Sequence, residues 1–213
     1  METETDHKFD KEEGLDQHYQ VLMEMGDCYA AASDFEQARS CYRKAADLSP
    51  DHAGPYVGLG VVGIETESLD DARAAFEVAR KLDSACAEAY AGLAMVHQKR
   101  KDYQPAFELY LKCLELDTDN LVALLGLFQT SCQKGTFDKI TQYLEVYLDR
   151  HPGDTSVLFC LATLYAKDGK LAKAADALET ILTLEPDKAE ATALLENVRR
   201  RLTQGQPTGA LGA

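Results

Sequence analysis

The feature that most restricts the fold of this chain is a gapless register of 34 residues. Five consecutive blocks follow this register: 19–52, 53–86, 87–120, 121–154 and 155–188. A period of this length is typical of proteins that stack one small unit on the next, so that each unit contacts mainly its neighbours. The register therefore predicts a solenoid of five repeats.

Each half of a block carries apolar residues at helical spacing, which predicts two amphipathic helices per block. Position eight is small in most blocks, position twenty is small in four of five, and position twenty-four is large and apolar. Small residues at the first two positions let the paired helices approach closely. Position eight holds Gly26, Gly60, Ala94, Phe128 and Ala162. Position twenty holds Ala38, Ala72, Ala106, Ile140 and Ala174. Position twenty-four holds Tyr42, Phe76, Tyr110, Leu144 and Leu178. Proline closes three blocks, where a helix must stop.

This pattern resembles that of the tetratricopeptide repeat (TPR) family, in which Leu-Gly, Tyr, Ala, an aromatic residue, Ala and a closing Pro recur. The first block matches at Gly26, Tyr29, Ala38, Tyr42, Ala45 and Pro50, and the fifth at Leu161, Tyr165, Gly169, Ala174 and Pro186. The resemblance implies an all-α fold, a right-handed superhelical solenoid of helix-turn-helix hairpins. It also implies an inner wall built from the first helix of each repeat.

The two ends of the chain do not follow the repeat. Residues 1–18 hold seven acids and two lysines, which predicts an acidic flexible segment or at best a frayed helix. Residues 187–202 keep four apolar side chains on one face and predict a helix that caps the solenoid. Residues 203–213 are expected to form a flexible tail. Two helices per block and the cap give an expected total of eleven helices and no strand.

Charge and hydropathy exclude several classes of partner. The formal net charge is -14, so the chain is a poor ligand for nucleic acids and for anionic membrane surfaces. The longest apolar run near the middle, Leu121 to Phe128, is too short to cross a bilayer. The N-terminus lacks the basic and apolar regions of a secretory signal. We expect a cytoplasmic protein, with peripheral attachment to a membrane through a protein partner left open.

No catalytic motif, cofactor site or metal site is expected. The six cysteines are never closer than 13 residues in sequence, whereas structural zinc sites need closer pairs. Cys132 and Cys160 fall on the expected inner wall of adjacent repeats. They are interpreted as small apolar fillers, and the alternative is a thiol-dependent regulatory or redox-sensing function.

The best-known binding residues of the family form a clamp for a C-terminal carboxylate, made of Lys, Asn and sometimes Arg on the inner wall. The corresponding positions here hold none of these residues, so the clamp is not carried over. The wall is apolar instead and predicts a groove for a protein or peptide, an amphipathic helix or apolar segment. The predicted groove residues are Met23, Val57, Gly58, Val61, Ile64, Gly92, Met95, Val122, Leu125, Gly126, Gln129, Phe159 and Thr163.

Three of these residues, Gly58, Gly92 and Gly126, share position six of their blocks. Glycine costs about 1 kcal/mol relative to alanine inside a helix, so its recurrence needs a reason. One interpretation is that a partner's backbone comes close there. Another is that the glycines relieve crowding between adjacent first helices. A third is that the N-terminal segment, from this chain or a second copy, fills the groove.

Repeat four departs from the pattern because Phe128, Ile140 and Tyr147 are large where the paired helices normally touch. We expect this hairpin to splay and to act as a hinge, with a rigid but wider hairpin as the alternative. The whole sequence predicts a non-catalytic scaffold or adaptor that binds protein partners and could self-assemble. The resemblance adds two examples, bacterial magnetosome-associated scaffolds and chaperones for secreted or pilus components.

Overall fold

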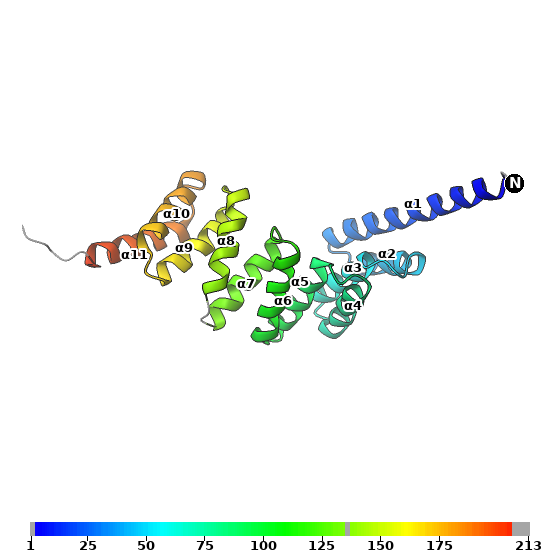
Figure 1. Ribbon diagram of the computed structural model, residues 1–213, viewed down its shortest axis with the longest axis horizontal. Coiled ribbons are helices and arrows are strands. Elements are labelled where there is room, and N and C mark those ends of the chain that lie inside the picture. Colours follow the sequence, from blue (N-terminus) through cyan, green and yellow to red (C-terminus); the bar gives the residue numbers. More distant parts are fainter. Residues whose placement is uncertain (1–2, 135–136, 206–213) are drawn as a thin grey trace, which may run out of the picture. The chain divides into compact units, whose positions relative to one another are not determined.

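The structure is a computed structural model that describes residues 3–134 and 137–205. This part of the chain contains eleven helices and no strand, as the sequence predicts (Figure 1). The helices are α1 Thr3–Ala31, α2 Phe35–Leu48, α3 Gly54–Glu65, α4 Leu69–Leu82, α5 Ala87–Lys99, α6 Tyr103–Leu116, α7 Leu121–Lys134, α8 Asp138–Arg150, α9 Thr155–Lys167, α10 Leu171–Leu184 and α11 Ala189–Gly205. Each 34-residue block forms one helical hairpin, which confirms the fold class.

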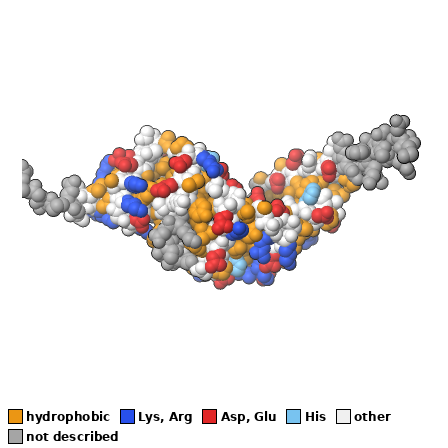
Figure 2. Space-filling view, viewed as in Figure 1, with side chains coloured by type: hydrophobic (Ala, Val, Ile, Leu, Met, Phe, Trp, Pro, Cys, Tyr) orange, Lys and Arg blue, Asp and Glu red, His pale blue; other side chains and the backbone are white. Residues whose placement is uncertain are grey.

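The chain divides into two compact units, Met1–Leu116 and Asp117–Ala213. The first unit holds α1 to α6, which are repeats one to three. The second holds α7 to α11, which are repeats four and five with the C-terminal helix. The division therefore falls between repeats three and four. Hydrophobic side chains reach the surface beside acidic and basic ones in both units (Figure 2).

The ends of the chain are more helical than the repeat alone requires. Helix α1 begins at Thr3 and includes most of the segment for which the sequence predicts flexibility or a frayed helix. Its flexibility in solution stays a prediction. Helix α11 supplies the expected C-terminal helix and ends at Gly205. The last eight residues of the expected tail, 206–213, lie outside the described residues.

In the hairpins of repeats one, two, three and five, the turn is made by one residue in the left-handed backbone region. The φ angles are +61° at Ser33, +57° at Glu67, +66° at Lys101 and +75° at Gly169. All four stand at position fifteen of their blocks. The next residue closes the turn, as when the Asp34 amide donates to the Tyr29 carbonyl at 2.8 Å, a bond typical of helix C-termini. This turn fixes where the second helix of these four repeats begins.

The core is built where an aromatic ring from a second helix packs against glycines of first helices. The Tyr42 ring lies against Gly26 of its own repeat and Gly58 of the next, where an added Cβ would come within 2.6 Å of the ring. Phe76 lies in the same way against Gly60 and Gly92.

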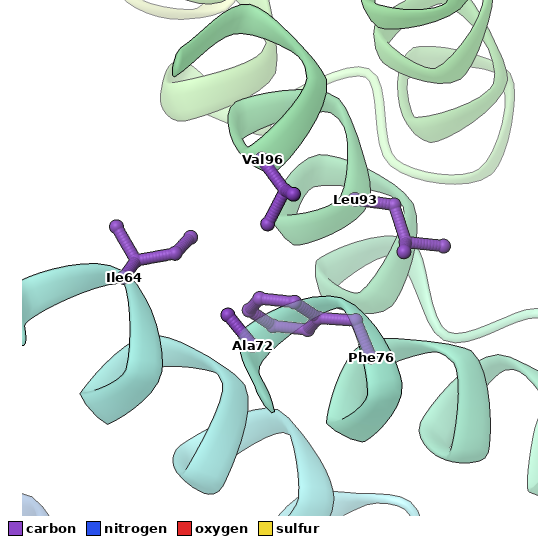
Figure 3. Close-up of a cluster of buried hydrophobic side chains, with 5 residues drawn as sticks. All are labelled: Ile64, Ala72, Phe76, Leu93 and Val96. Atoms are coloured by element: carbon purple, nitrogen blue, oxygen red, sulfur yellow. The ribbon is translucent and has the colours of Figure 1, made fainter. Parts of the chain in front are cut away.

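Phe76 also packs in a buried cluster that joins α3, α4 and α5 (Figure 3). The other members of this cluster are Ile64, Ala72, Leu93 and Val96. The chain's own rings thus account for the glycines at positions 58 and 92. This corrects the interpretation that a partner's backbone needs them. The crowding that they relieve comes from the ring of a second helix rather than from an adjacent first helix.

Candidate functional site

A groove of about 810 Å³ opens on the first unit, along the first helices of its three repeats. It is bordered by α1, α3, the beginning of α5 and the loops that precede α3 and α5. Its lining residues are Tyr19, Met23, Asp27, Ala30, Tyr42, Asp51, His52, Ala53, Gly54, Val57, Gly58, Val61, Asp83, Ala85, Cys86 and Glu88.

The apolar part of the lining comes from first-helix residues spaced four apart. Val57 and Val61 lie one turn apart on α3, and Met23 lies on α1. Side chains at this spacing share a helix face, which explains why they line the same groove. Val61 is 43% exposed. The groove therefore offers apolar area that no described residue of the chain covers.

Four carboxylates also line the groove. Asp27 lies on α1, Asp51 in the loop before α3, Asp83 at the end of α4 and Glu88 in the first turn of α5. All four side chains are exposed. Among the described residues, none of them forms an ion pair with a lysine, arginine or histidine. The groove is thus apolar inside and negatively charged at several points along its border.

Two of these carboxylates are fixed by hydrogen bonds from the chain itself. The Tyr42 hydroxyl donates to Asp27 Oδ1 at 2.7 Å, and the Ala85 amide donates to Asp83 Oδ1 at 2.8 Å. Glu88 accepts a weak bond from the Cys86 thiol at 3.5 Å. Each carboxylate has room to accept further donors, because an ionised carboxylate offers about four lone-pair sites.

Two phenols and one thiol of the groove are neutral donors. Burial, and secondly the bond to Asp27, raise the pKa of Tyr42 far above its usual value of 10.0. Burial also raises the pKa values of Tyr19 and Cys86. The Tyr19 ring contacts His52 edge-on, with 5.0 Å between ring centroids. At neutral pH the phenols and the thiol therefore stay protonated, so the formal negative charges come from the carboxylates.

Comparison with known proteins supports the repeat assignment. Two family models described as tetratricopeptide repeat match residues 23–85 and 87–120. The chain belongs to the tetratricopeptide repeat family. The remaining repeats of this TPR protein lie outside the matched residues and are assigned by their register and by the helical hairpins.

The curated relatives that the chain matches are much longer proteins. It is 24% identical over 137 residues to anaphase-promoting complex subunit 3 of Schizosaccharomyces pombe, covering 64% of this chain and 21% of that protein. It is 25% identical over 175 residues to human protein O-mannosyl-transferase TMTC3, covering 80% of this chain and 19% of that protein. The TPR chain thus spans about a fifth of the length of these relatives.

Solved structures share the fold at low sequence identity. Pseudomonas aeruginosa PilF matches with a TM-score of 0.77 at 20% identity, over 89% of this chain and 86% of that one. YrrB, described as a TPR protein with an unusual peptide-binding site, matches with a TM-score of 0.61 at 20% identity, over 84% of this chain and 90% of that chain. A chain of the APC/C hetero-tetramer Cut9–Hcn1 matches with a TM-score of 0.69 at 20% identity, over 92% of this chain and 39% of that chain.

The first unit contains seven of the predicted groove residues, and four of them line the groove: Met23, Val57, Gly58 and Val61. Two others are corrected by the structure. Ile64 is 3% exposed within the core cluster, and Gly92 is buried beneath the Phe76 ring. Neither offers surface to a ligand. Met95 is half-buried and packs against the same cluster.

The remaining predicted groove residues belong to the second unit and do not line this groove. Val122, Leu125, Gly126 and Gln129 lie on α7, and Phe159 and Thr163 lie on α9. Val122 is 50% exposed. Gly126 is buried, and the Thr163 hydroxyl donates to the Phe159 carbonyl at 2.8 Å. That these residues form a binding surface stays a prediction.

The expected hinge residues lie in or beside the core of the second unit. Ile140 and Tyr147 are buried, and Phe128 is half-buried. The Tyr147 hydroxyl donates to Asp154 Oδ2 at 3.0 Å. In their described parts, α7 and α8 pack less extensively against each other than the helices of the other hairpins do. This agrees with the large residues at positions eight and twenty, and hinge motion itself stays a prediction.

Several groove residues were not predicted from the sequence. Tyr19, Asp51, His52 and Asp83 lie at repeat starts or in the loops between repeats, whereas the prediction considered the interior of the first helices. A usable signal was present, because acids recur in the last four positions of the blocks, at Asp51, Asp83, Asp117 and Asp119. Of these, Asp51 and Asp83 precede α3 and α5 and line the groove beside them.

The two cysteines of the thiol alternative differ in their surroundings. Cys160 is buried, and this burial raises its pKa to about 11, with a smaller contribution from Cys132. The thiol of Cys160 therefore stays protonated at neutral pH, the unreactive form. Lys167 Nζ lies 3.9 Å from the Cys132 sulfur. Burial of Cys160 favours the filler interpretation for this residue.

No group of three or more His, Cys, Asp or Glu residues in the described part of the chain is placed to hold a metal ion. None of the described helices combines the length and apolar content needed to cross a membrane. The expectation of a cytoplasmic location stays a prediction.

Proposed function

We propose that this TPR protein is a scaffold or adaptor that binds a protein or peptide segment in the groove of its first unit, without catalysis. The observation that carries the proposal is the uncovered apolar lining along the consecutive first helices α1 and α3, above all the 43% exposed Val61. A concave apolar surface of this volume is the usual form of a binding site. A helix or extended segment with an apolar side chain fits it.

The known proteins support this proposal by analogy. The structure of YrrB was described as having an unusual peptide-binding site, and Cut9 is held in a hetero-tetramer with Hcn1. One relative is named a transferase, but this chain covers only 19% of it. The proposal accordingly assigns binding, and no reaction, to the shared repeats. Self-assembly and attachment to a membrane through a partner belong to the same proposal.

The experiment compares two valines with the same substitution. A displayed library of short random peptides is selected on the full chain, and selected peptides are then measured against Val61→Gln and Val78→Gln. Val61 lines the groove, whereas Val78 lies on α4 outside it at 36% exposure. Losing the burial of one valine should weaken binding roughly tenfold for Val61→Gln, and Val78→Gln should bind as the wild type. Equal binding by both variants, or no selected peptide, would overturn the proposal.

A further inference from the structure

We propose that the ligand of this groove is a cationic segment, in which an apolar side chain is flanked by lysine or arginine. The inference rests on the proposed function and adds the chemistry of the partner. It starts from the four carboxylates that line the groove beside its apolar surface, at Asp27, Asp51, Asp83 and Glu88.

Some carboxylates of the first unit have cationic partners within the chain, whereas the groove carboxylates, like other exposed acids such as Asp47, have none among the described residues. Asp70 pairs with Arg100 at 2.7 Å, and Glu77 pairs with Arg73 at 3.1 Å. No such partner reaches the groove carboxylates among the described residues. Carboxylates gathered along a concave low-dielectric surface reinforce one another's field and attract cations. A ligand with basic side chains would supply the missing charge.

The geometry adds preorganisation to this field. Tyr42 fixes Asp27 at 2.7 Å, and the Ala85 amide fixes Asp83 at 2.8 Å. Since the two carboxylates are already held, a lysine or arginine that binds them loses less conformational entropy than it would with free side chains. The apolar lining at Met23, Val57 and Val61 receives the intervening apolar side chain.

The same charges argue against other occupants. Residues 1–18 carry seven acids and two lysines, so the chain's own N-terminal segment, from this copy or another, would be repelled. A peptide ending in acidic residues would meet the same repulsion. The groove is therefore opposite in charge to a clamp that binds a C-terminal carboxylate with lysine and asparagine.

The library selection described above also tests this inference. Peptides that bind the wild type and lose affinity to Val61→Gln should be enriched in lysine and arginine on either side of an apolar residue. If Val61-dependent peptides carry no excess of basic residues, the inference is wrong while the proposed function stands. If no peptide depends on Val61, the proposed function itself fails.

A charge-matched pair of variants tests the residues directly. Asp51→Asn with Glu88→Gln removes two groove charges that hold no backbone amide of the chain. Asp47→Asn with Asp176→Asn removes two exposed charges that lie outside the groove. Both double variants change the net charge from -14 to -12. Exposed ion pairs contribute little individually, so the groove variant should bind a selected basic peptide roughly 3- to 10-fold more weakly. The control should bind as the wild type.

Two results would overturn the inference. One is equal affinity of the two double variants for the selected basic peptide. The other is an unchanged preference of the groove variant for the basic peptide over a copy with glutamine in place of each lysine and arginine. Circular dichroism of each variant checks that the helices are retained, so that weaker binding is not caused by unfolding.

Discussion

The ring of Tyr42 lies between the backbones of two helices, at Gly26 on α1 and at Gly58 on α3. A Cβ at position 58 would come within 2.6 Å of the ring, and one at position 26 within 2.5 Å, so the ring cannot retreat to either side. Alanine favours a helix over glycine by about 1 kcal/mol, but forcing a methyl group into a packed core costs about 1–3 kcal/mol. We expect Gly58→Ala to lower the free energy of unfolding by about 1 kcal/mol, measured by urea denaturation.

Gly153→Ala is the matched control, because no atom lies within 4 Å of its Cβ position. Its free energy of unfolding should stay within about 0.5 kcal/mol of the wild type. Replacing Tyr42 by Leu should remove most of the cost of Gly58→Ala, since the two positions then no longer clash. A more stable Gly58→Ala variant would contradict this account of the core.

Buried tyrosines make the stability of the protein sensitive to alkaline pH. Burial raises the pKa values of Tyr42 and Tyr110 well above the usual 10.0. Above pH 10 the unfolded chain therefore releases phenolic protons that the folded chain keeps, so the free energy of unfolding falls as pH rises. Below pH 10 these two residues have no such effect.

The Tyr42→Phe variant isolates one of these protons. Its free energy of unfolding should fall less steeply above pH 10, by about 1.4 kcal/mol per pH unit. The measurement is urea denaturation at several alkaline pH values, with ultraviolet absorbance reporting tyrosinate. Identical slopes for the variant and the wild type would show that Tyr42 ionises as freely when folded as when unfolded.

At the scale of the helix, the sequence predicted the elements well because their signals are local. Apolar spacing and small residues at fixed positions gave the hairpins, and the structure confirms eleven helices in the described part of the chain. The turn was less predictable. Ser33, Glu67 and Lys101 adopt the left-handed backbone region without being glycine, and only the repeat of position fifteen relates them. A local turn at the end of the first helix, closed by bonds such as that from the Asp34 amide to the Tyr29 carbonyl, holds that conformation, and the residue types at position fifteen do not predict it.

Repeat four is the element whose dynamics we expect to differ. Its large residues at positions eight and twenty, Phe128 and Ile140, separate helices that elsewhere meet at glycine or alanine. The described parts of α7 and α8 accordingly pack less extensively against each other. Local opening is easier where fewer contacts must be broken. We expect amides of 121–134 and 138–150 to exchange hydrogen faster than those of α3 and α4.

Native-state hydrogen exchange with mass spectrometry measures this difference. The hairpins α3–α4 and α5–α6 serve as the reference, because both are closely packed. Protection of repeat four equal to that of the reference would exclude local opening and leave a rigid, wider hairpin as the explanation.

For the whole molecule, the candidate site was predictable only where it follows the repeat. Met23, Val57 and Val61 were found because they stand at inner-wall positions of first helices. The carboxylates Asp51 and Asp83 were missed because they lie in the loops between repeats, whose side chains reach the groove only when consecutive hairpins stack. The division of the chain at Leu116 was also not predicted. It coincides with the change from aromatic residues at position twenty-four to Leu144 and Leu178.

The net charge of -14 should act in opposite directions on stability and on binding. Self-repulsion destabilises the compact state, and raising the salt from about 0.01 M to 0.1 M shortens the screening length from about 30 Å to about 10 Å. We therefore expect the melting temperature of the free protein to rise over this range.

The same screening weakens the attraction of a cationic peptide, so its association rate should fall by roughly tenfold. Both charge-neutralised double variants should keep this salt dependence, because a net charge of -12 still steers the peptide. The variant with Asp51→Asn and Glu88→Gln should differ mainly by a faster dissociation rate of the peptide. The ion pairs that this variant loses form only after the peptide has reached the groove. Stopped-flow measurements at several salt concentrations separate the two rates. An association rate that does not change with salt would show that electrostatic attraction does not guide the ligand to this protein.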